Sequence, residues 1–275
     1  MNYELRGIIY KDKAVITELF DNDLREVLWK NQELPSQIIE TDTCVEATLI
    51  TYNGLWKDPK KYFKSWSLYT SPSPAPSWFR KDHRKMFRLA ADAWWTEHVL
   101  VQKEISHLSS GFFYLKGCNV KTISGDTCVI CDGSKIGTLK DTSVVLKAFD
   151  CSAVNHMQDQ SLLRYLMDHS TIYYADDSSK IERMTSTSMI NNLQGNATVS
   201  YMDSYSRILT ADDHSRISVM RGNSLIHSMA KESIVEEMLD YSFVAKLVEN
   251  ARVNEFSGRH AVIPLDTPDP IMPFN

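Results

Sequence analysis

The sequence has no uninterrupted apolar stretch of about 18 residues, which a membrane-spanning helix requires. Its first residues also lack a basic segment followed by a leucine-rich core, so we expect no secretory signal and a cytoplasmic protein. Neither sign of charge dominates, because 30 Lys and Arg residues face 35 Asp and Glu residues and leave a net charge of −5. A strongly basic nucleic-acid-binding protein is therefore excluded, while the 43% hydrophobic content is typical of a packed globular protein.

Cysteine is scarce, and its five residues are irregularly spaced: Cys44, Cys118, Cys128, Cys131 and Cys151. An odd number without an export signal indicates reduced thiols. Cys128 and Cys131 form a C-x-x-C motif, with Cys118 and Cys151 as conceivable further zinc ligands. A closed structural zinc site usually joins two such pairs, and only one is present. We therefore predict no metal site, and no motif indicates a cofactor.

Familiar catalytic motifs are also missing. The sequence contains no G-x-S-x-G, no P-loop, no G-x-G-x-x-G and no H-E-x-x-H. His83, Asp92, His98 and Glu104 fall on one candidate helix, but their spacings do not keep them on one face. We expect a protein without enzymatic activity, and an unrecognised enzyme in the N-terminal part is the alternative.

A nine-residue repeat occupies the second half of the chain. Stepping by nine from Ile130 to Phe256 meets only apolar residues, and six positions beyond each lies Val, Ile or, once, Leu163. Four positions beyond each anchor is a small residue, usually serine. The third position of the unit is most often Asp or Gly, as at Asp141 and Gly195, which favours a turn. The unit is [M/L]-x-[D/G]-x-S-x-[V/I]-x-x, repeated fifteen times without a gap.

This period decides the fold. Nine residues turn a helix by about 900°, and an odd spacing also flips faces along a straight strand, so neither element can bury the anchors on one side. The chain must turn once in each unit. One unit is too short to enclose side chains between sheets about 10 Å apart, whereas two units suffice. We predict a mainly β protein: a two-sided parallel β-solenoid of 18 residues per coil and about eight coils, preceded by a small α+β domain.

The repeat resembles known arrays. Its S-x-[V/I] pair is similar to the inward pair of pentapeptide-repeat proteins, and the whole unit resembles the tandem S-S-x-V-x-x-M arrays of uncharacterised proteins from gut bacteria and their phages. The resemblance covers about 150 residues and implies a solenoid but no activity. It extends the expected location to a virion, if a phage encodes the chain. Calcium-binding nonapeptides need paired glycines, which this unit lacks.

We divide the chain into an α+β head over residues 1–112, a solenoid over residues 113–264 and a proline-rich tail over residues 265–275. In the head, Tyr3–Tyr10, Ala14–Thr17 and Thr43–Tyr52 are expected strands. A short helix is expected after Asp21, and a longer one from Lys81 to about Ile105 that buries Met86, Leu89, Ala90, Trp94 and Val101.

The leading functional hypothesis is a structural or protein-binding scaffold, such as a phage particle or assembly component. The outward position between Ser and Val/Ile becomes apolar near the C-terminal end, at Leu225, Ile234 and Phe243, with Ala245 nearby. An apolar patch on a polar rod marks a protein partner or self-association. Isolated exposed apolar residues with no partner are the plain alternative.

A second hypothesis is a nucleic-acid-directed module in the region 57–95. Basic residues there alternate with aromatic rings, the combination that holds single strands. The candidate residues are Lys60, Lys61, Lys64, Arg80, Lys81, Arg84, Lys85, Arg88, Trp66 and Trp78. Against it, 15 basic and 15 acidic residues cancel over residues 1–112, so a solvated basic helix face is the plainer interpretation.

Overall fold

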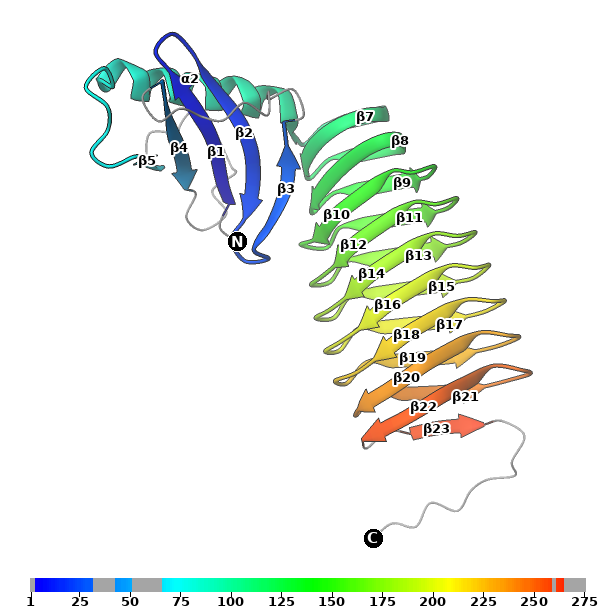
Figure 1. Ribbon diagram of the computed structural model, residues 1–275. Helices are drawn as coiled ribbons and strands as arrows, with labels where there is room; N and C mark the ends of the chain where they lie inside the picture. Colours follow the sequence, from blue (N-terminus) through cyan, green and yellow to red (C-terminus); the bar gives the residue numbers. More distant parts are fainter. Residues whose placement is uncertain (1–2, 32–42, 51–65, 259–260, 265–275) are drawn as a thin grey trace. The chain divides into compact units, whose positions relative to one another are not determined.

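The computed structural model describes residues 3–31, 43–50, 66–258 and 261–264 (Figure 1). The chain forms two compact units, Met1–Val99 and Leu100–Asn275. The predicted class is confirmed, since the chain is mainly β and combines a parallel solenoid with a small antiparallel sheet and a helix.

The first unit is built on an antiparallel sheet of five strands in the order β3-β2-β1-β4-β5. The strands are β1 Tyr3–Tyr10, β2 Ala14–Asp21, β3 Glu26–Lys30, β4 Cys44–Ile50 and β5 Ser67–Ser71. The prediction of a short helix after Asp21 is wrong, because a turn and strand β3 follow there. Asp21 Oδ1 instead accepts hydrogen bonds from the N–H groups of Asp23 and Leu24, at 2.9 and 3.1 Å, and so closes a turn that leads into β3.

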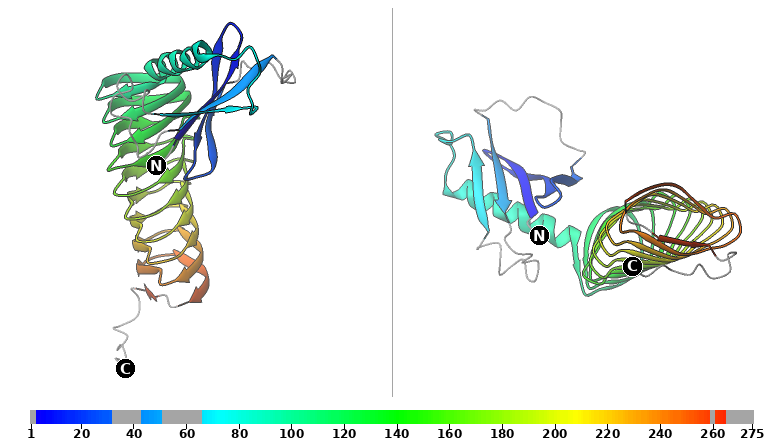
Figure 2. Two further views of the ribbon diagram at one scale, coloured as in Figure 1. Left: turned by 90° about the vertical axis from the view of Figure 1, so that its left-hand side faces the viewer. Right: turned by 90° about the horizontal axis from the view of Figure 1, so that it is seen from below.

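One helix, α2 (Lys81–His98), packs against this sheet (Figure 2). Gly7 of β1 makes room for it, because a Cβ there would lie 2.6 Å from Cε2 of Phe87. The prediction that this helix ends near Ile105 is wrong. The helix ends at His98, the backbone is extended at Val99, and the chain continues as β6 (Val99–Val101). The buried face also differs from the prediction: Trp94 is buried as expected, but Leu89 is 60% exposed. The buried helix residues are Phe87, Ala91, Trp94 and Trp95.

The second unit is the solenoid, whose strands follow one another in parallel (Figure 1). Its first strands are β7 Glu104–Lys116, β8 Asn119–Asp132, β9 Lys135–Leu139, β10 Val144–Phe149, β11 Ala153–Met157, β12 Leu162–Leu166, β13 Thr171–Ala175 and β14 Lys180–Met184. The remainder are β15 Met189–Leu193, β16 Thr198–Met202, β17 Arg207–Ala211, β18 Arg216–Met220, β19 Leu225–Met229, β20 Ile234–Asp240, β21 Phe243–Leu247, β22 Arg252–Gly258 and β23 Ala261–Pro264.

From β9 onward each coil takes eighteen residues, as predicted, whereas the coils of β7 and β8 take 15 to 17 residues. Strands two apart in sequence pair in parallel, so that Val145 lies opposite Leu163 and Leu163 opposite Ile181. Strands β7 and β8 each form one coil and β9–β22 form seven more, giving about nine coils rather than eight. Seen along its axis, the solenoid is a flattened coil with two long sides (Figure 2, right).

The solenoid begins earlier than the regular repeat. Parallel pairing starts with Glu104 opposite Asn119, whereas the expected start was residue 113. Ile105 and Leu108 already show the three-residue spacing of the regular inward pair and pack against the core. The repeat is therefore present in this coil, although its turn residues differ from those of later units.

The interior is filled as the period requires. The Val/Ile column and the Met/Leu column both point inward, and residues such as Ile181 and Met184 are fully buried. Asp and Gly occupy the turns because the third position adopts positive φ, at Asp159 (59°) and Gly195 (64°) for example. L-residues other than Asp and Asn rarely adopt this conformation.

Candidate binding surfaces of the solenoid

The solenoid has two outer surfaces. We call face A the outward side chains of the odd-numbered strands β9–β21, and face B those of the even-numbered strands β10–β22. Because the register repeats every eighteen residues, each outward side chain lies next to its equivalent on the adjacent coil. A short sequence feature that recurs at this spacing therefore becomes a continuous column on one face.

The predicted apolar residues divide between the two faces. Leu225 of β19 lies opposite Phe243 of β21 on face A, with Ala245 further along β21, and all three are half-buried. Leu209, on the preceding strand of the same face, is 39% exposed. Leu225 and Phe243 form a small apolar patch, whereas the exposed His227 of β19 lies between Leu209 and Ala245 in the register.

Ile234 does not belong to an exposed patch. It lies on face B between Arg216 and Arg252 in the strand register and is only 8% exposed. Arg216 of β18 also forms an ion pair with Glu236, which lies on β20 two residues beyond Ile234. Arginine stems cover apolar neighbours in this way, so Ile234 is withdrawn from the predicted contact surface.

The residues proposed for nucleic acid are only partly available. Lys60, Lys61 and Lys64 lie outside the described residues. Trp66 is 4% exposed, and its ring meets that of Trp95 edge-on at 5.7 Å between centroids. It therefore cannot serve as a platform on which a base stacks.

The remaining basic residues of this group lie at the start of α2 or just before it. Arg80, Lys81, Arg84 and Lys85 are exposed. Arg88 donates a 3.1 Å hydrogen bond to the carbonyl of Trp66, and burial followed by repulsion from Arg84 lowers its pKa. This side chain supports the fold rather than a ligand.

Trp78 is half-buried. It packs edge-on against Phe79 and His83, with ring centroids 6.1 and 5.1 Å away. Arg84 lies over the ring of Phe79, with Cζ 5.5 Å from the ring centroid. The aromatic residues near the helix therefore pack among themselves.

A pocket on face B was not found from the sequence. Its volume is about 450 Å³, and it is open to solvent. It is lined by Tyr165, Lys180, Glu182, Arg183, Ser200 and Tyr201. These residues come from three successive strands of face B, β12, β14 and β16. The signal in the sequence was the spacing of eighteen that joins Tyr165, Arg183 and Tyr201, which a search for apolar positions passes over.

Arg183 is the central residue of this pocket. In the register it lies between Tyr165 and Tyr201, and its Cζ is 5.9 Å from the centroid of Tyr201. Its Nε is buried and has no hydrogen-bond partner. Glu182 lies near Arg164 instead, at 3.7 Å. Within the described residues neither Arg183 nor Lys180 has an acidic partner, so the pocket presents two uncompensated positive charges beside aromatic rings.

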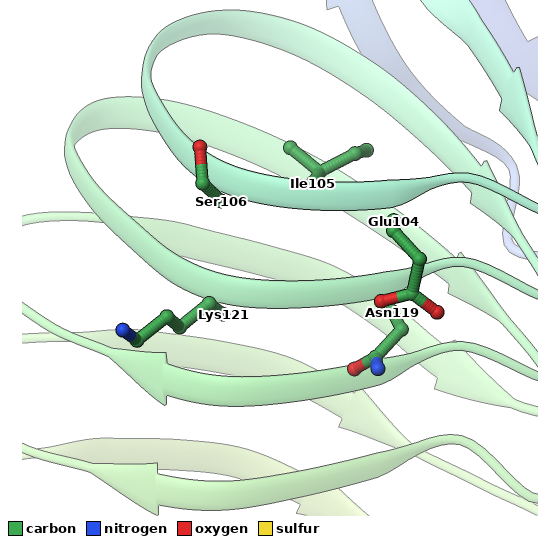
Figure 3. Close-up of a pocket in the computed structure, with 5 residues that line it drawn as sticks. All are labelled: Glu104, Ile105, Ser106, Asn119 and Lys121. Carbon is green, nitrogen blue, oxygen red and sulfur yellow. The ribbon is translucent and has the colours of Figure 1, made fainter.

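A second hollow, of about 420 Å³, lies at the first coils and is lined by Glu104, Ile105, Ser106, Asn119 and Lys121. In Figure 3 Glu104 and Asn119 lie side by side, while Lys121 and Ser106 point away from them. Their polar atoms do not converge on a common point. This arrangement does not form a nucleophile–base pair.

The histidines considered for catalysis are separated and engaged locally. His83 Nε2 is 3.2 Å from the carbonyl oxygen of Lys11, and the ring of His98 stacks on that of Trp94 with centroids 4.6 Å apart. Glu104 lies on β7 and is not part of the helix. These contacts are those of structural side chains.

The two cysteines of the C-x-x-C motif point to different sides of strand β8. Cys131 is fully buried in the solenoid core, whereas Cys128 is an outward residue of the same strand β8. All five cysteines are free, and the described residues contain no cluster of His, Cys, Asp and Glu suited to a metal ion.

No protein-family model, no curated protein and no solved structure matches the chain. Among the described residues, no helix combines the length and the apolar character needed to cross a bilayer.

Proposed function

We propose that this chain is a protein-binding scaffold without enzymatic activity, and that the face B pocket around Arg183 is its contact site. The observation that carries the proposal is the column Tyr165–Arg183–Tyr201, in which an unpaired guanidinium lies between two tyrosine rings in the strand register. Tyrosine and arginine are enriched among the few residues that dominate the binding energy of protein interfaces.

The solenoid holds these side chains rigidly. Each belongs to a strand that pairs on both sides, so their spacing is set by the backbone rather than by flexible loops. A preorganised surface loses little conformational entropy on binding. The exposed Lys180 and the half-buried Arg183 would pair with an acidic side chain of the partner, while Tyr201, which is 46% exposed, would cover it.

A nucleic-acid-directed module is less well supported. Trp66 is buried, and the pocket on face B has two uncompensated cations beside Glu182. Duplex and single-strand binding usually needs more phosphate contacts than two cations provide. The exposed group Arg80, Lys81, Arg84 and Lys85 remains the only part of that hypothesis with accessible charge among the described candidates.

The resemblance to repeat arrays of gut bacteria and their phages supports a more specific version of this proposal. In it, the chain is a scaffold in a phage particle or its assembly, found in the cytoplasm or the virion. The Leu225–Phe243 patch on face A then serves self-association. Size-exclusion chromatography with mass measurement tests this second surface, since Phe243→Asp should lower the mass of any oligomer. An unchanged mass rejects it.

The contact site is tested by photo-crosslinking in the cells that make the protein. A photoreactive phenylalanine derivative at position 201 replaces a tyrosine of similar shape. We expect a covalent adduct with one protein, which Arg183→Glu abolishes. Arg207→Glu is the matched control, because Arg207 is an exposed arginine on face A.

An adduct that persists in Arg183→Glu, or one that Arg207→Glu removes equally, contradicts the proposed site. Adducts with many unrelated proteins contradict it as well, because a specific pocket should select one partner.

A further inference from the structure

Face A carries an uncharged surface rich in tyrosine and amide groups at the middle of the solenoid. It spans four adjacent strands, β11, β13, β15 and β17. We call it the neutral face and define it by their paired outward residues: Asn155, His156, Tyr173, Tyr174, Asn191, Asn192, Leu209 and Thr210. None of the eight is Asp, Glu, Lys or Arg, whereas the paired outward positions of β12 and β14 on face B carry Arg164, Glu182 and Arg183.

Two tyrosine rings are the most prominent feature of the neutral face. Tyr173 is 43% exposed and Tyr174 is 42% exposed. The ring of Tyr174 stacks on that of His156 from the preceding coil, with centroids 4.9 Å apart and planes within 9°. This contact fixes the orientation of the ring while leaving part of it accessible to solvent. One face of the Tyr174 ring is therefore covered by His156, and the remaining ring surface is held in a fixed orientation.

The amides beside the rings are held by their neighbours. Asn192 Nδ2 donates to the carbonyl of Tyr173 at 3.3 Å, and Thr210 Oγ1 donates to Asn192 Oδ1 at 2.8 Å. Asn191 Oδ1 is buried and has no partner among the described residues. These groups can both donate and accept, and their combined capacity exceeds the bonds they make to one another.

We infer that the neutral face binds a neutral carbohydrate chain. A sugar ring presents C–H groups on its faces, which pack on an aromatic ring, and hydroxyl groups around its rim, which both donate and accept hydrogen bonds. Tyr173 and Tyr174 supply the first kind of contact, and Asn155, Asn192 and Thr210 supply the second. Arg207, at the start of β17, is the one Asp, Glu, Lys or Arg residue of the four strands, so the patch of eight matches an uncharged ligand.

The repeat of the solenoid suits a linear polymer. Adjacent coils are about 4.8 Å apart, so a chain lying along the axis meets a new row of outward groups at each coil. The rows need not be identical, because amide, phenol and hydroxyl groups can each serve a sugar hydroxyl. A ligand that spans several coils would gain affinity from several weak contacts at once.

A protein partner fits this surface less well. Leu209 is the only aliphatic residue of the eight, and an apolar protein surface laid over the amides would leave their hydrogen-bonding groups unsatisfied, at a cost in binding. Nucleic acid is disfavoured too, because no cation in the patch meets the phosphates.

Affinity electrophoresis tests the inference directly. The native protein is run through gels that contain hydroxyethylcellulose, dextran, mannan or the anionic polygalacturonate. We expect at least one neutral polysaccharide to retard the chain and polygalacturonate to leave it unretarded. Tyr174→Ala should raise the apparent Kd roughly tenfold, from the loss of one aromatic contact.

The matched control is Tyr201→Ala, which removes an equally exposed tyrosine from face B and should leave retardation unchanged. Thermal melting verifies that both variants are folded, which their exposed positions favour. The inference is overturned if none of the three neutral polysaccharides retards the protein. It is also overturned if polygalacturonate alone does, or if both tyrosine variants weaken retardation equally.

Discussion

The backbone N–H of Asp159 donates a 3.1 Å hydrogen bond to Oδ2 of Asp177, one coil further along the solenoid. Asp141 makes the same bond to Asp159. Asp159 and Asp177 therefore have two roles. Each residue occupies a turn position with positive φ, and its carboxylate accepts a hydrogen bond from a backbone N–H in the turn of the preceding coil. The aspartates of the repeat stabilise the stacking of coils as well as the turns themselves.

Replacing Asp177 tests this double role. Asp177→Ala leaves the N–H of Asp159 without its acceptor and places alanine at φ 55°, so we expect unfolding free energy to fall by about 1–3 kcal/mol. Asp177→Asn keeps an acceptor and tolerates the left-handed conformation, so its loss should be smaller. Urea denaturation of both variants gives the comparison. Equal losses would mean that the bond between coils contributes nothing.

Some turns use a different acceptor, and the reason is visible in the next coil. Asp177 N–H bonds to Oδ1 of Asp176, at 2.7 Å, because the following coil has Gly195 at the position that would supply a carboxylate. Asp212 acts in the same way as Asp176. It accepts the hydrogen bond from Asp213 N–H, because the next coil has Lys231 at the position that would supply a carboxylate. The two kinds of acceptor substitute for each other.

A double-mutant cycle measures this substitution. A Cβ at Gly195 would lie 2.7 Å from Asp176 Oδ1 and 2.9 Å from Asp177 N, so Gly195→Asp alone should be destabilising. Asp176→Ala alone removes an acceptor. We expect the double variant to be more stable than the sum of the single effects by about 1 kcal/mol, because the new carboxylate can replace the old one. Additive effects in thermal or urea unfolding would refute the exchange.

The sequence predicts the solenoid well because its determinants are local and repeated. A period of nine with inward residues such as Ile181 and Met184 leaves few ways to bury them, and every coil repeats the same constraint. The prediction fails at the first coil, which contains Ile105 and Leu108. Its turn residues differ from the repeat, so the sequence analysis placed it outside the solenoid. The head was predicted less well, because the turn after Asp21 depends on a side-chain bond to the backbone that apolar periodicity does not reveal.

The candidate sites were harder to predict for a physical reason. Exposure on a repeating face depends on neighbours eighteen residues away in both directions, so Ile234 looked exposed although two arginines flank it in the register. Tyr165, Arg183 and Tyr201 were overlooked because each is unremarkable alone. Their significance comes only from the coil length, which must be known before outward columns can be read.

The serine hydroxyls of the repeat are expected to differ in their contribution. Ser152 Oγ is 2.7 Å from the Phe149 carbonyl and accepts from Ser134 N–H at 3.1 Å. Ser179 Oγ is buried with no hydrogen-bond partner. Ser152→Ala should therefore lower the free energy of unfolding by about 1–2 kcal/mol, whereas Ser179→Ala should leave it unchanged or raise it. Ala197 already occupies the equivalent position one coil beyond Ser179.

Urea unfolding of both serine variants decides the point. Both variants replace serine by alanine, so any difference in unfolding free energy should come from the hydrogen bonds that each hydroxyl makes. A loss in Ser179→Ala as large as that in Ser152→Ala would show that its hydroxyl is bonded in solution.

Thiol reactivity should follow burial. Cys151 is exposed, while Cys44, Cys118 and Cys131 are buried and Cys128 is half-buried. Burial raises the pKa of Cys128 to about 11, which leaves little of the reactive thiolate near neutral pH. We expect a maleimide or disulfide reagent to modify one thiol quickly in the folded protein and the others only after denaturation. Cys151→Ser should abolish the fast phase, and a fast phase that survives this change would contradict the assignment.

The same pKa makes stability depend on alkaline pH. The folded state keeps the Cys128 proton up to about pH 11, while the unfolded chain releases it near the ordinary value for a thiol. Between these two pKa values the unfolded state binds fewer protons than the folded state. The stability that the Cys128 thiol contributes is therefore fully present below the ordinary thiol pKa and is lost as pH rises toward the folded-state pKa of about 11. We expect the stability difference between the parent chain and Cys128→Ala to shrink across this range in urea unfolding. Cys151→Ala, which alters an exposed thiol, is the control, and a parallel decline in both variants would contradict the prediction.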